Sequence, residues 1–351
     1  MGPRGDHREA DVRGRGRRDL LALALTLLAA TTACSGSGGA PATRTPSATG
    51  SSATPAALAA PEVTLVEAGR ALAGVLGADR VLSLASPRQD ADDRNRARQF
   101  RDGQKALNDA AGAPARYTWG RPQLLVPREQ RGPFWFAAIV DREDETGDVR
   151  PAVLTLIEEG GRWSISSVSL LEPGMRAPEI AKDAQGYAVA LDYEDPTVAI
   201  SPRLMAPLHA TSAEEGTAGF TAGLIEKGPH TTGYADEIAT KRLFYKEKQC
   251  TGYDSIFAAS GFPVQALRTA DGGAMVMYSL TRTTTVTSKV EPCGEIRVPP
   301  EARGLTKETS VTKELRTVEV QQYVSVVPAR NSRKSARIIG YLGGLTKVFV
   351  S

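Results

Sequence analysis

The sequence contains few of the residues from which metal sites and nucleophilic active sites are built. Three histidines and three cysteines occur among 351 residues. Only His209 and His230 follow the first 33 residues, and neither has a partner at the spacing of a zinc site. No G-x-S-x-G elbow and no phosphate-binding P-loop are present. The sequence therefore predicts no metal and no cofactor, and it favours a protein that is not an enzyme.

Basic residues are not in excess either. The 43 Lys and Arg nearly balance the 40 Asp and Glu, and the first 33 residues hold six of the former and four of the latter. A nucleic-acid-binding surface requires a concentration of positive charge. The balance therefore predicts no nucleic-acid partner.

One short apolar run, Leu20–Ala30, predicts export from the cell. It follows an arginine-rich lead and is shorter than the roughly 20 residues of a membrane-spanning helix. Residues 1–33 are therefore expected to form a signal peptide. Cys34 resembles the lipid-accepting cysteine of bacterial lipoproteins, although Thr31 stands where that family has leucine. The resemblance implies a lipid anchor at the extracytoplasmic face of the cell membrane; the alternative is an ordinary signal peptide with a chance cysteine.

Two further features concern export and the anchor. Arg17 and Arg18 resemble a twin-arginine signal, so both the general secretory route and the twin-arginine route remain open. Residues 34–61 consist almost entirely of small residues and proline, with almost no charge. Such a segment cannot bury a core, and we expect it to form a flexible tether.

The two remaining cysteines are Cys250 and Cys293. An oxidising compartment favours a disulfide between them, whereas two buried free thiols are the alternative. The bridge would close a loop of roughly 40 residues and stabilise the fold by about 3–4 kcal/mol in the chain-entropy model.

Hydrophobic periodicity predicts an α+β body with two domains. A domain of about 150 residues is common, so the length after the leader suggests two. Residues 62–174 are expected to form the first domain, with helices at 65–76 and 91–111 that precede the strands. The predicted strands lie at 117–119, 123–127, 134–141, 152–158 and 163–170.

The second domain is expected at residues 203–351 and repeats this order. Residues 175–202 contain several prolines and are expected to connect the domains along the surface of one of them. The predicted helices lie at 203–225 and 233–248, and the predicted strands at 264–269, 274–287, 318–328 and 337–349. Helices followed by antiparallel strands are typical of an α+β fold.

Two stretches of the second domain carry a family resemblance. Residues 228–233 (GPHTTG) and 262–274 (FPVQALRTADGGA) resemble a functionally uncharacterised family of secreted actinobacterial lipoproteins. The resemblance extends over most of the chain and implies no activity. The order of helices and curved sheet is also similar to nuclear-transport-factor-2-like cones, which often hold a pocket.

Four patterns have both a functional and a structural interpretation. His230 precedes a predicted helix, where it lines a cleft or bonds only within its own turn. Ser310 and Lys313 spell S-x-x-K, but the companion motifs of penicillin-recognising enzymes are absent and a charged loop is favoured. The acidic run at 141–145 is favoured as a solvated hairpin tip. Consecutive aromatics at 134–136 point to both faces of a strand, and we expect core rather than an aromatic platform.

The sequence thus predicts a membrane-tethered extracytoplasmic lipoprotein that binds an unknown protein or small ligand. An enzyme whose pocket is assembled from scattered acids and hydroxyls is the alternative. A structural envelope protein is a third class, and a large exposed apolar patch would be its sign.

Overall fold

The computed structural model describes residues 59–77, 117–128, 130, 133–247, 250–289, 294–302 and 305–351. All of them lie within one compact unit, residues 57–351. The predicted signal peptide, Cys34, the second predicted helix and Cys293 lie outside the described residues.

The first helix, α1 (Leu65–Leu76), begins and ends where the sequence predicts. The hydroxyl of Thr64 accepts a hydrogen bond of 3.1 Å from the backbone N–H of Glu67, which is a typical N-cap. The acidic side chain in the first turn also suits the positive end of the helix dipole. Ala68 and Leu72 are buried in the first core, so the predicted apolar face is the one that packs.

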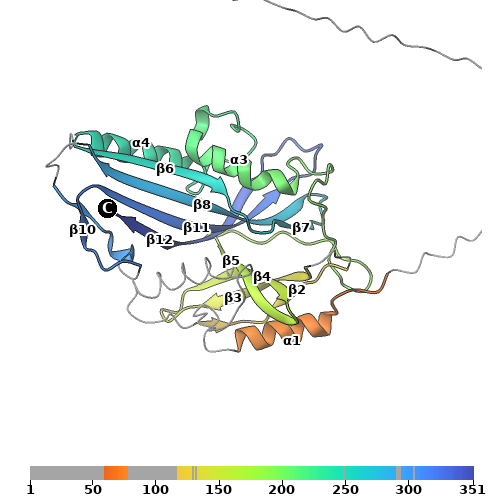
Figure 1. Ribbon diagram of the computed structural model, residues 1–351. Coiled ribbons are helices and arrows are strands. Elements are labelled where there is room, and N and C mark those ends of the chain that lie inside the picture. Colours follow the sequence, from red (N-terminus) through yellow and green to blue (C-terminus); the bar gives the residue numbers. More distant parts are fainter. Residues whose placement is uncertain are drawn as a thin grey trace, which may run out of the picture. The chain divides into compact units, whose positions relative to one another are not determined.

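Ten strands of the described residues form one antiparallel sheet (Figure 1). Their order is β1-β3-β4-β5-β12-β11-β8-β6, with β2 beside β3 and β7 beside β8. The bounds are β1 (Thr118–Trp119), β2 (Gln123–Leu125), β3 (Trp135–Glu143), β4 (Val149–Glu159), β5 (Arg162–Leu171), β6 (Thr251–Ala259), β7 (Gln265–Arg268), β8 (Ala274–Ser288), β11 (Glu314–Val327) and β12 (Arg337–Val350). A separate two-stranded sheet contains β9 (Ile296–Arg297) and β10 (Ser310–Val311).

The last strand joins the two halves of the chain in this one sheet. Tyr341 of β12 pairs with Leu170 of β5, and Gly340 pairs with Leu171. A Cβ on Gly340 would lie 3.1 Å from the carbonyl oxygen of Leu170, so glycine permits the close approach. The sequence predicts a separate sheet for each half, and the structure differs because local patterns do not encode which distant strands pair.

The buried side chains form a core in each half and a third core that both halves share. Phe136 and Leu154 belong to the first-half core, and Tyr278 belongs to the second. In the shared core, residues of β2 to β5 meet residues of β7, β8, β11 and β12. Both halves therefore remove apolar surface from water against each other.

The connecting segment does not lie on the surface of one half. Ala188 and Val198 are buried, and Ala188 pairs with Pro127 of the first half through an isolated bridge. Ala190 pairs in the same way with Leu267 of the second half. The segment is held between both halves because its apolar residues complete their cores.

Two helices precede the strands of the second half. α3 (Pro202–Glu215) is shorter than predicted, because Gly216 takes a positive φ of 65° and the short 3-10 helix η1 (Gly216–Ala218) follows. α4 (Thr232–Glu247) lies within a residue of its predicted range. β6 was not predicted, since glycine, aspartate, serine and alanine make up much of its sequence and are poor strand formers. None of the helices described is long and apolar enough to cross a membrane.

Candidate functional site

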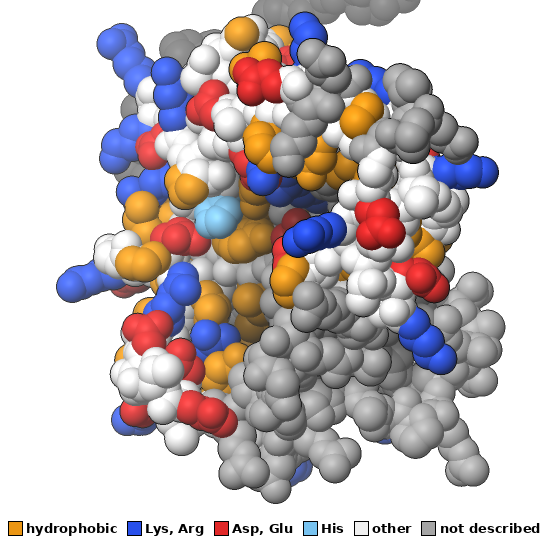
Figure 2. Space-filling model, turned by 90° about the vertical axis from the view of Figure 1, so that its left-hand side faces the viewer, with side chains coloured by type: hydrophobic (Ala, Val, Ile, Leu, Met, Phe, Trp, Pro, Cys, Tyr) orange, Lys and Arg blue, Asp and Glu red, His pale blue; other side chains and the backbone are white. Residues whose placement is uncertain are grey.

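A pocket with a cavity volume of about 430 Å³ lies on the sheet face formed by β6, β8, β11 and β12. α4 contributes one wall, and residues 296–301, which include β9 and the start of η2 (Pro300–Ala302), contribute another. Small-molecule sites commonly measure about 300–1,000 Å³. Seen from the side where α4 and β12 end, the molecule is hollowed, with hydrophobic side chains inside and charged side chains of both signs around them (Figure 2).

The floor of this pocket consists of side chains from β8 and β11, which the strand register brings together. Glu319 of β11 is directly opposite Arg282 of β8, and Leu315 is opposite Val286. Alternate residues of a strand share one face, so these side chains point to the same side of the sheet. Val286 and Leu315 also belong to a small core with Ile296, which holds the 296–301 wall on the sheet.

Arg282 is the buried cation of the floor, with only 11% of its side chain exposed. Its guanidinium donates to Glu237 of α4 at 3.0 and 3.4 Å and to the hydroxyl of Ser255 at 2.9 Å. It also lies 5.1 Å from the ring centre of Tyr234 and 5.3 Å from that of Phe257. Burial acts to lower the pKa of Arg282, but the hydrogen bonds and charge of Glu237, together with Tyr253 and Glu319, outweigh it and leave the pKa raised.

Glu319 is the half-buried anion of the floor. Its Oε1 accepts a hydrogen bond of 2.8 Å from the hydroxyl of Tyr341. Burial first, and then the charge of Glu319, raise the pKa of Tyr341, so this hydroxyl stays protonated and donates. A Cβ on Gly343 would lie 2.1 Å from the hydroxyl oxygen of Tyr341 and 2.5 Å from Oε1, so the contact requires glycine there.

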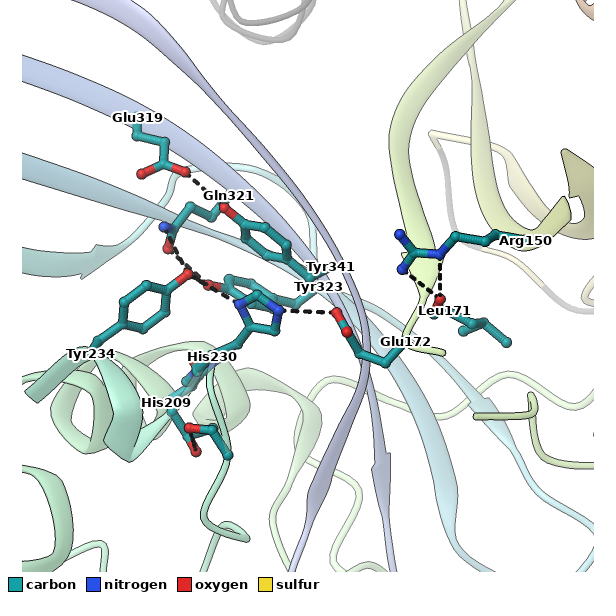
Figure 3. Close-up of polar contacts among 12 residues, drawn as sticks. Arg150, Leu171, Glu172, His209, His230, Tyr234, Glu319, Gln321, Tyr323 and Tyr341 are labelled. Atoms are coloured by element: carbon teal, nitrogen blue, oxygen red, sulfur yellow. Dashed lines mark hydrogen bonds and ion pairs between the residues drawn. The ribbon is translucent and has the colours of Figure 1, made fainter. Parts of the chain in front are cut away.

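His230 lies beside this contact, two residues before α4 (Figure 3). Its Nε2 is 3.0 Å from Oε1 of Glu172, and its Nδ1 is 3.3 Å from the hydroxyl of Tyr234. The imidazole stacks on Tyr341, with ring centres 4.1 Å apart. The side chain is 20% exposed, so His230 bonds well beyond its own turn; its role as a cleft residue stays a prediction.

His209 of α3 is fully buried, and the sequence did not mark it as a site residue. Its Nδ1 is 2.9 Å from the hydroxyl of Tyr278, and its Nε2 is 2.5 Å from the carbonyl oxygen of His230. Burial lowers the pKa of His209 to about 4, against the opposing effect of the bond to His230. The neutral ring with a proton on Nε2 satisfies both bonds, since Nε2–H donates to the carbonyl and Nδ1 accepts from the phenol.

A buried glutamine completes the network under α4. The hydroxyl of Tyr323 donates to Oε1 of Gln321 at 2.8 Å, and Nε2 of Gln321 donates to the hydroxyl of Tyr234 at 3.2 Å. The two phenol oxygens lie 3.3 Å apart. Burial raises the pKa of both tyrosines. A satisfied buried network of this kind favours one position of α4 on the sheet, because an unpaired buried polar group is costly.

The S-x-x-K pattern does not form the arrangement that its catalytic interpretation requires. Ser310 lies in β10 and pairs with Arg297 of β9, and Lys313 is exposed. A nucleophile of that kind stands at a helix start, whereas this serine stands in a strand. In the part of the chain that the structure describes, no three His, Cys, Asp or Glu side chains gather as a metal site.

The acidic and aromatic runs lie in the first half, away from the lining of the pocket. Asp144 is in the turn between β3 and β4, where its carboxylate accepts hydrogen bonds from Thr146 and Asp148. Phe136 is buried in the first-half core, and Trp135 packs against the shared core on the other face. Both faces of this strand are therefore covered, as the core interpretation predicts.

Similar proteins place the chain in a family. An uncharacterized lipoprotein of Streptomyces coelicolor is 29% identical over 181 residues, 48% of either protein. An uncharacterized lipoprotein of Streptomyces avermitilis is 28% identical over 222 residues, 60% of this chain and 64% of that protein. The chain thus spans about half the length of the first relative and less than two thirds of the second. No solved structure matches the chain.

These relatives confirm the resemblance to an uncharacterised actinobacterial lipoprotein family. Residues 88–348 match the family model described as "Domain of unknown function (DUF8094)". That range contains both halves of the sheet, α3, α4 and the whole lining of the pocket. The chain therefore belongs to the DUF8094 family.

Proposed function

We propose that this chain is a lipid-anchored extracytoplasmic protein that binds a small ligand in the pocket between α4 and residues 296–301. The lipobox-like sequence at Cys34 and the lipoprotein names of the Streptomyces relatives support the anchor. Three acyl chains on one cysteine provide enough apolar surface for stable membrane attachment. The tether at 34–61 then carries the body away from the membrane.

The pocket is the observation that carries the binding proposal. Its volume suits a small molecule, and the two charged groups of its floor, Arg282 and Glu319, stand on paired strands. Arg282 and Glu319 are each fixed by a neighbour, Glu237 and Tyr341 respectively. A binding site needs side chains that are held in place before the ligand arrives, because ordering them on binding costs free energy.

Native mass spectrometry tests this proposal. The full-length protein is purified in detergent from an actinobacterial host, and we expect a persistent extra mass. Thr317→Trp places a large side chain in the pocket and should abolish that mass. Thr240→Trp, on the exposed side of α4, is the matched control and should retain it. A clean protein mass for wild type would contradict the proposal and turn the search to protein partners by cross-linking in cells.

Cell fractionation tests the anchor. Cys34→Ala removes the sulfur that accepts the lipid in this proposal, so the protein should move from the membrane to the soluble extracytoplasmic fraction. An unchanged membrane-bound pool would show that another element holds the protein there.

A disulfide between Cys250 and Cys293 is also part of the proposal. Cys250 stands directly before β6, and an extracytoplasmic location favours oxidation. Thiols are counted on the unfolded, unreduced protein. Two reactive thiols in addition to Cys34 would exclude the bridge.

The division of the body into two domains of similar plan is likewise a proposal. Residues 62–174 and 203–351 each have a core of their own, which supports it, and 175–202 connect them. A nuclear-transport-factor-2-like plan for each half rests on the order of helices and strands. If the body has two domains, hydrogen exchange should give two groups of amides with different opening free energies. A single cooperative group would exclude separate domains.

An enzyme is the second candidate, because one arrangement resembles an acid–base site. The imidazole of His230 lies between the carboxylate of Glu172 and the phenol of Tyr234, and it is partly exposed. An imidazole oriented by a carboxylate is a common general base. If the copurified ligand is converted over time, His230→Gln should stop the conversion and leave the bound mass; conversion at an unchanged rate would refute this role.

A further inference from the structure

We infer that the pocket takes a zwitterion, either a free α-amino acid or a short peptide, with its ammonium group at Glu319 and its carboxylate toward Lys241 and Arg297. This inference rests on the proposed small-ligand function and names the chemical class of the ligand. It follows from the charges of the pocket and from which of them already have partners.

The buried cation of the floor is already satisfied. The guanidinium of Arg282 donates to both oxygens of Glu237, to Ser255 and to the hydroxyl of Tyr253. A carboxylate of a ligand would have to displace one of these acceptors. Arg282 therefore does not provide the site for an anion.

The half-buried anion of the floor, Glu319, has a donor on only one of its two carboxylate oxygens among the described residues. Tyr341 donates to one carboxylate oxygen of Glu319, and no described residue donates to the other. Glu319 lies opposite Arg282, but Glu237 already neutralises that charge, so these three groups together carry a net charge of −1. Hydrogen bonds between an ammonium group and a carboxylate are among the strong ones. The floor thus favours a cationic end of the ligand.

The rim of the pocket has the opposite charge. Lys241 of α4 and Arg297 of β9 are exposed, and neither has an ion-pair partner among the described residues. Glu301 of η2 also lines the pocket and offsets one of these two positive charges. The rim therefore carries a net charge of +1, which favours an anionic end of the ligand directed outward.

Between floor and rim, the lining is aromatic and aliphatic. Tyr245 and Tyr253 are stacked, with ring centres 5.4 Å apart and planes at 10°. Val286, Leu315 and Leu345 also line the pocket. These surfaces suit an apolar side chain, so leucine and its peptides are the appropriate probes.

Calorimetric titration of the full-length protein in detergent tests the inference. L-leucine and Leu-Leu are compared with N-acetyl-L-leucine, which lacks the ammonium group, and with L-leucinamide, which lacks the carboxylate. We expect N-acetyl-L-leucine to bind at least ~10-fold more weakly than leucine, because a hydrogen bond to a charged group is lost. Leucinamide should lose less affinity than N-acetyl-L-leucine does, since the rim charges are exposed and screened. Tighter binding of leucine or of Leu-Leu identifies the free amino acid or the peptide.

Glu319→Gln is the decisive variant, because its amide oxygen still accepts from Tyr341 and the fold is preserved. This variant should bind leucine ~10-fold more weakly than wild type and should bind N-acetyl-L-leucine with unchanged affinity. Glu314→Gln, on the same strand outside the pocket, is the matched control. Equal affinity for leucine and N-acetyl-L-leucine, or a Glu319→Gln variant that binds like wild type, would overturn the inference.

The failure of this inference is distinguishable from the failure of the proposed function. Mass spectrometry could show a ligand that Thr317→Trp removes while neither leucine nor Leu-Leu binds. In that case the inferred ligand class is wrong, and the proposal that the pocket binds a small ligand is retained. If no ligand copurifies and no probe binds, both are wrong.

Discussion

Acidification should destabilise this protein well above the pH at which its carboxylates titrate, and His209 is the reason. The imidazole is fully buried, and its two nitrogens are bonded to Tyr278 and to the carbonyl of His230. Burial lowers its pKa from 6.5 to about 4. Below pH 6.5 the unfolded chain therefore binds a proton that the folded protein does not. The contribution of His209 to the free energy of unfolding is fully present above pH 6.5 and is lost as the pH falls toward 4.

The size of the effect follows from the pKa difference. Each pKa unit corresponds to about 1.4 kcal/mol, so the fall from 6.5 to about 4 removes ~3 kcal/mol from the free energy of unfolding. The steepest slope for one proton is about 1.4 kcal/mol per pH unit. Many domains have only about 5–15 kcal/mol in total, so the loss would be a large fraction of the stability.

Urea denaturation between pH 7 and pH 4 measures this slope in wild type and in His209→Gln. Glutamine does not titrate, so the variant should lack the His209 part of the slope, and carboxylates common to both proteins cancel in the difference. His230→Gln is the control, because it leaves the imidazole of His209 in place and should keep the slope. Parallel stability curves for wild type and His209→Gln would refute the reasoning, as would an NMR titration in which His209 gains its proton near pH 6.5.

Three further substitutions test the packing around the pocket and the core, each by urea denaturation. Gly343→Ala should cost about 1–3 kcal/mol, because its Cβ would overlap the Tyr341–Glu319 contact; an unchanged stability would show that this contact is not tight. Gln321→Leu should cost about 1–3 kcal/mol, since it removes the amide that bonds to the buried phenols of Tyr234 and Tyr323, and a neutral result would mean that water replaces the amide. Phe136→Ala should cost about 3–5 kcal/mol, and a cost below 1 kcal/mol would contradict its place in the core.

Local structure was largely predictable from the sequence because it depends on neighbouring residues. The helical spacing of α1 and the strand pattern of β4 follow from which positions are apolar, and both elements lie close to their predicted ranges. The failures also have local causes. The α3 helix stops at Gly216, where a positive φ was not evident from the sequence, and β6 contains residues that rarely favour strands.

The joining of the halves and most of the site could not be predicted, because both depend on contacts between distant residues. Nothing near Leu170 or Tyr341 in the sequence indicates that they pair. The GPHTTG stretch indicates His230, but its partner Glu172 directly follows β5, in the other half of the chain. No sequence pattern indicates a functional role for His209, because a single histidine within an apolar helix is usually a core residue.

Tyr341 explains why the junction of the halves and the pocket are parts of one structure. Its backbone pairs with β5, its ring stacks on His230, and its hydroxyl donates to Glu319 on the pocket floor. Glu172 follows β5 directly and bonds to the same imidazole, so β5, the His230 loop and β12 fix one another. Because α4 begins two residues after His230 and forms a wall of the pocket, a shift of β5 against β12 would change the shape of the pocket. The shape of the pocket is therefore set by the pairing of the first half of the chain with its last strand.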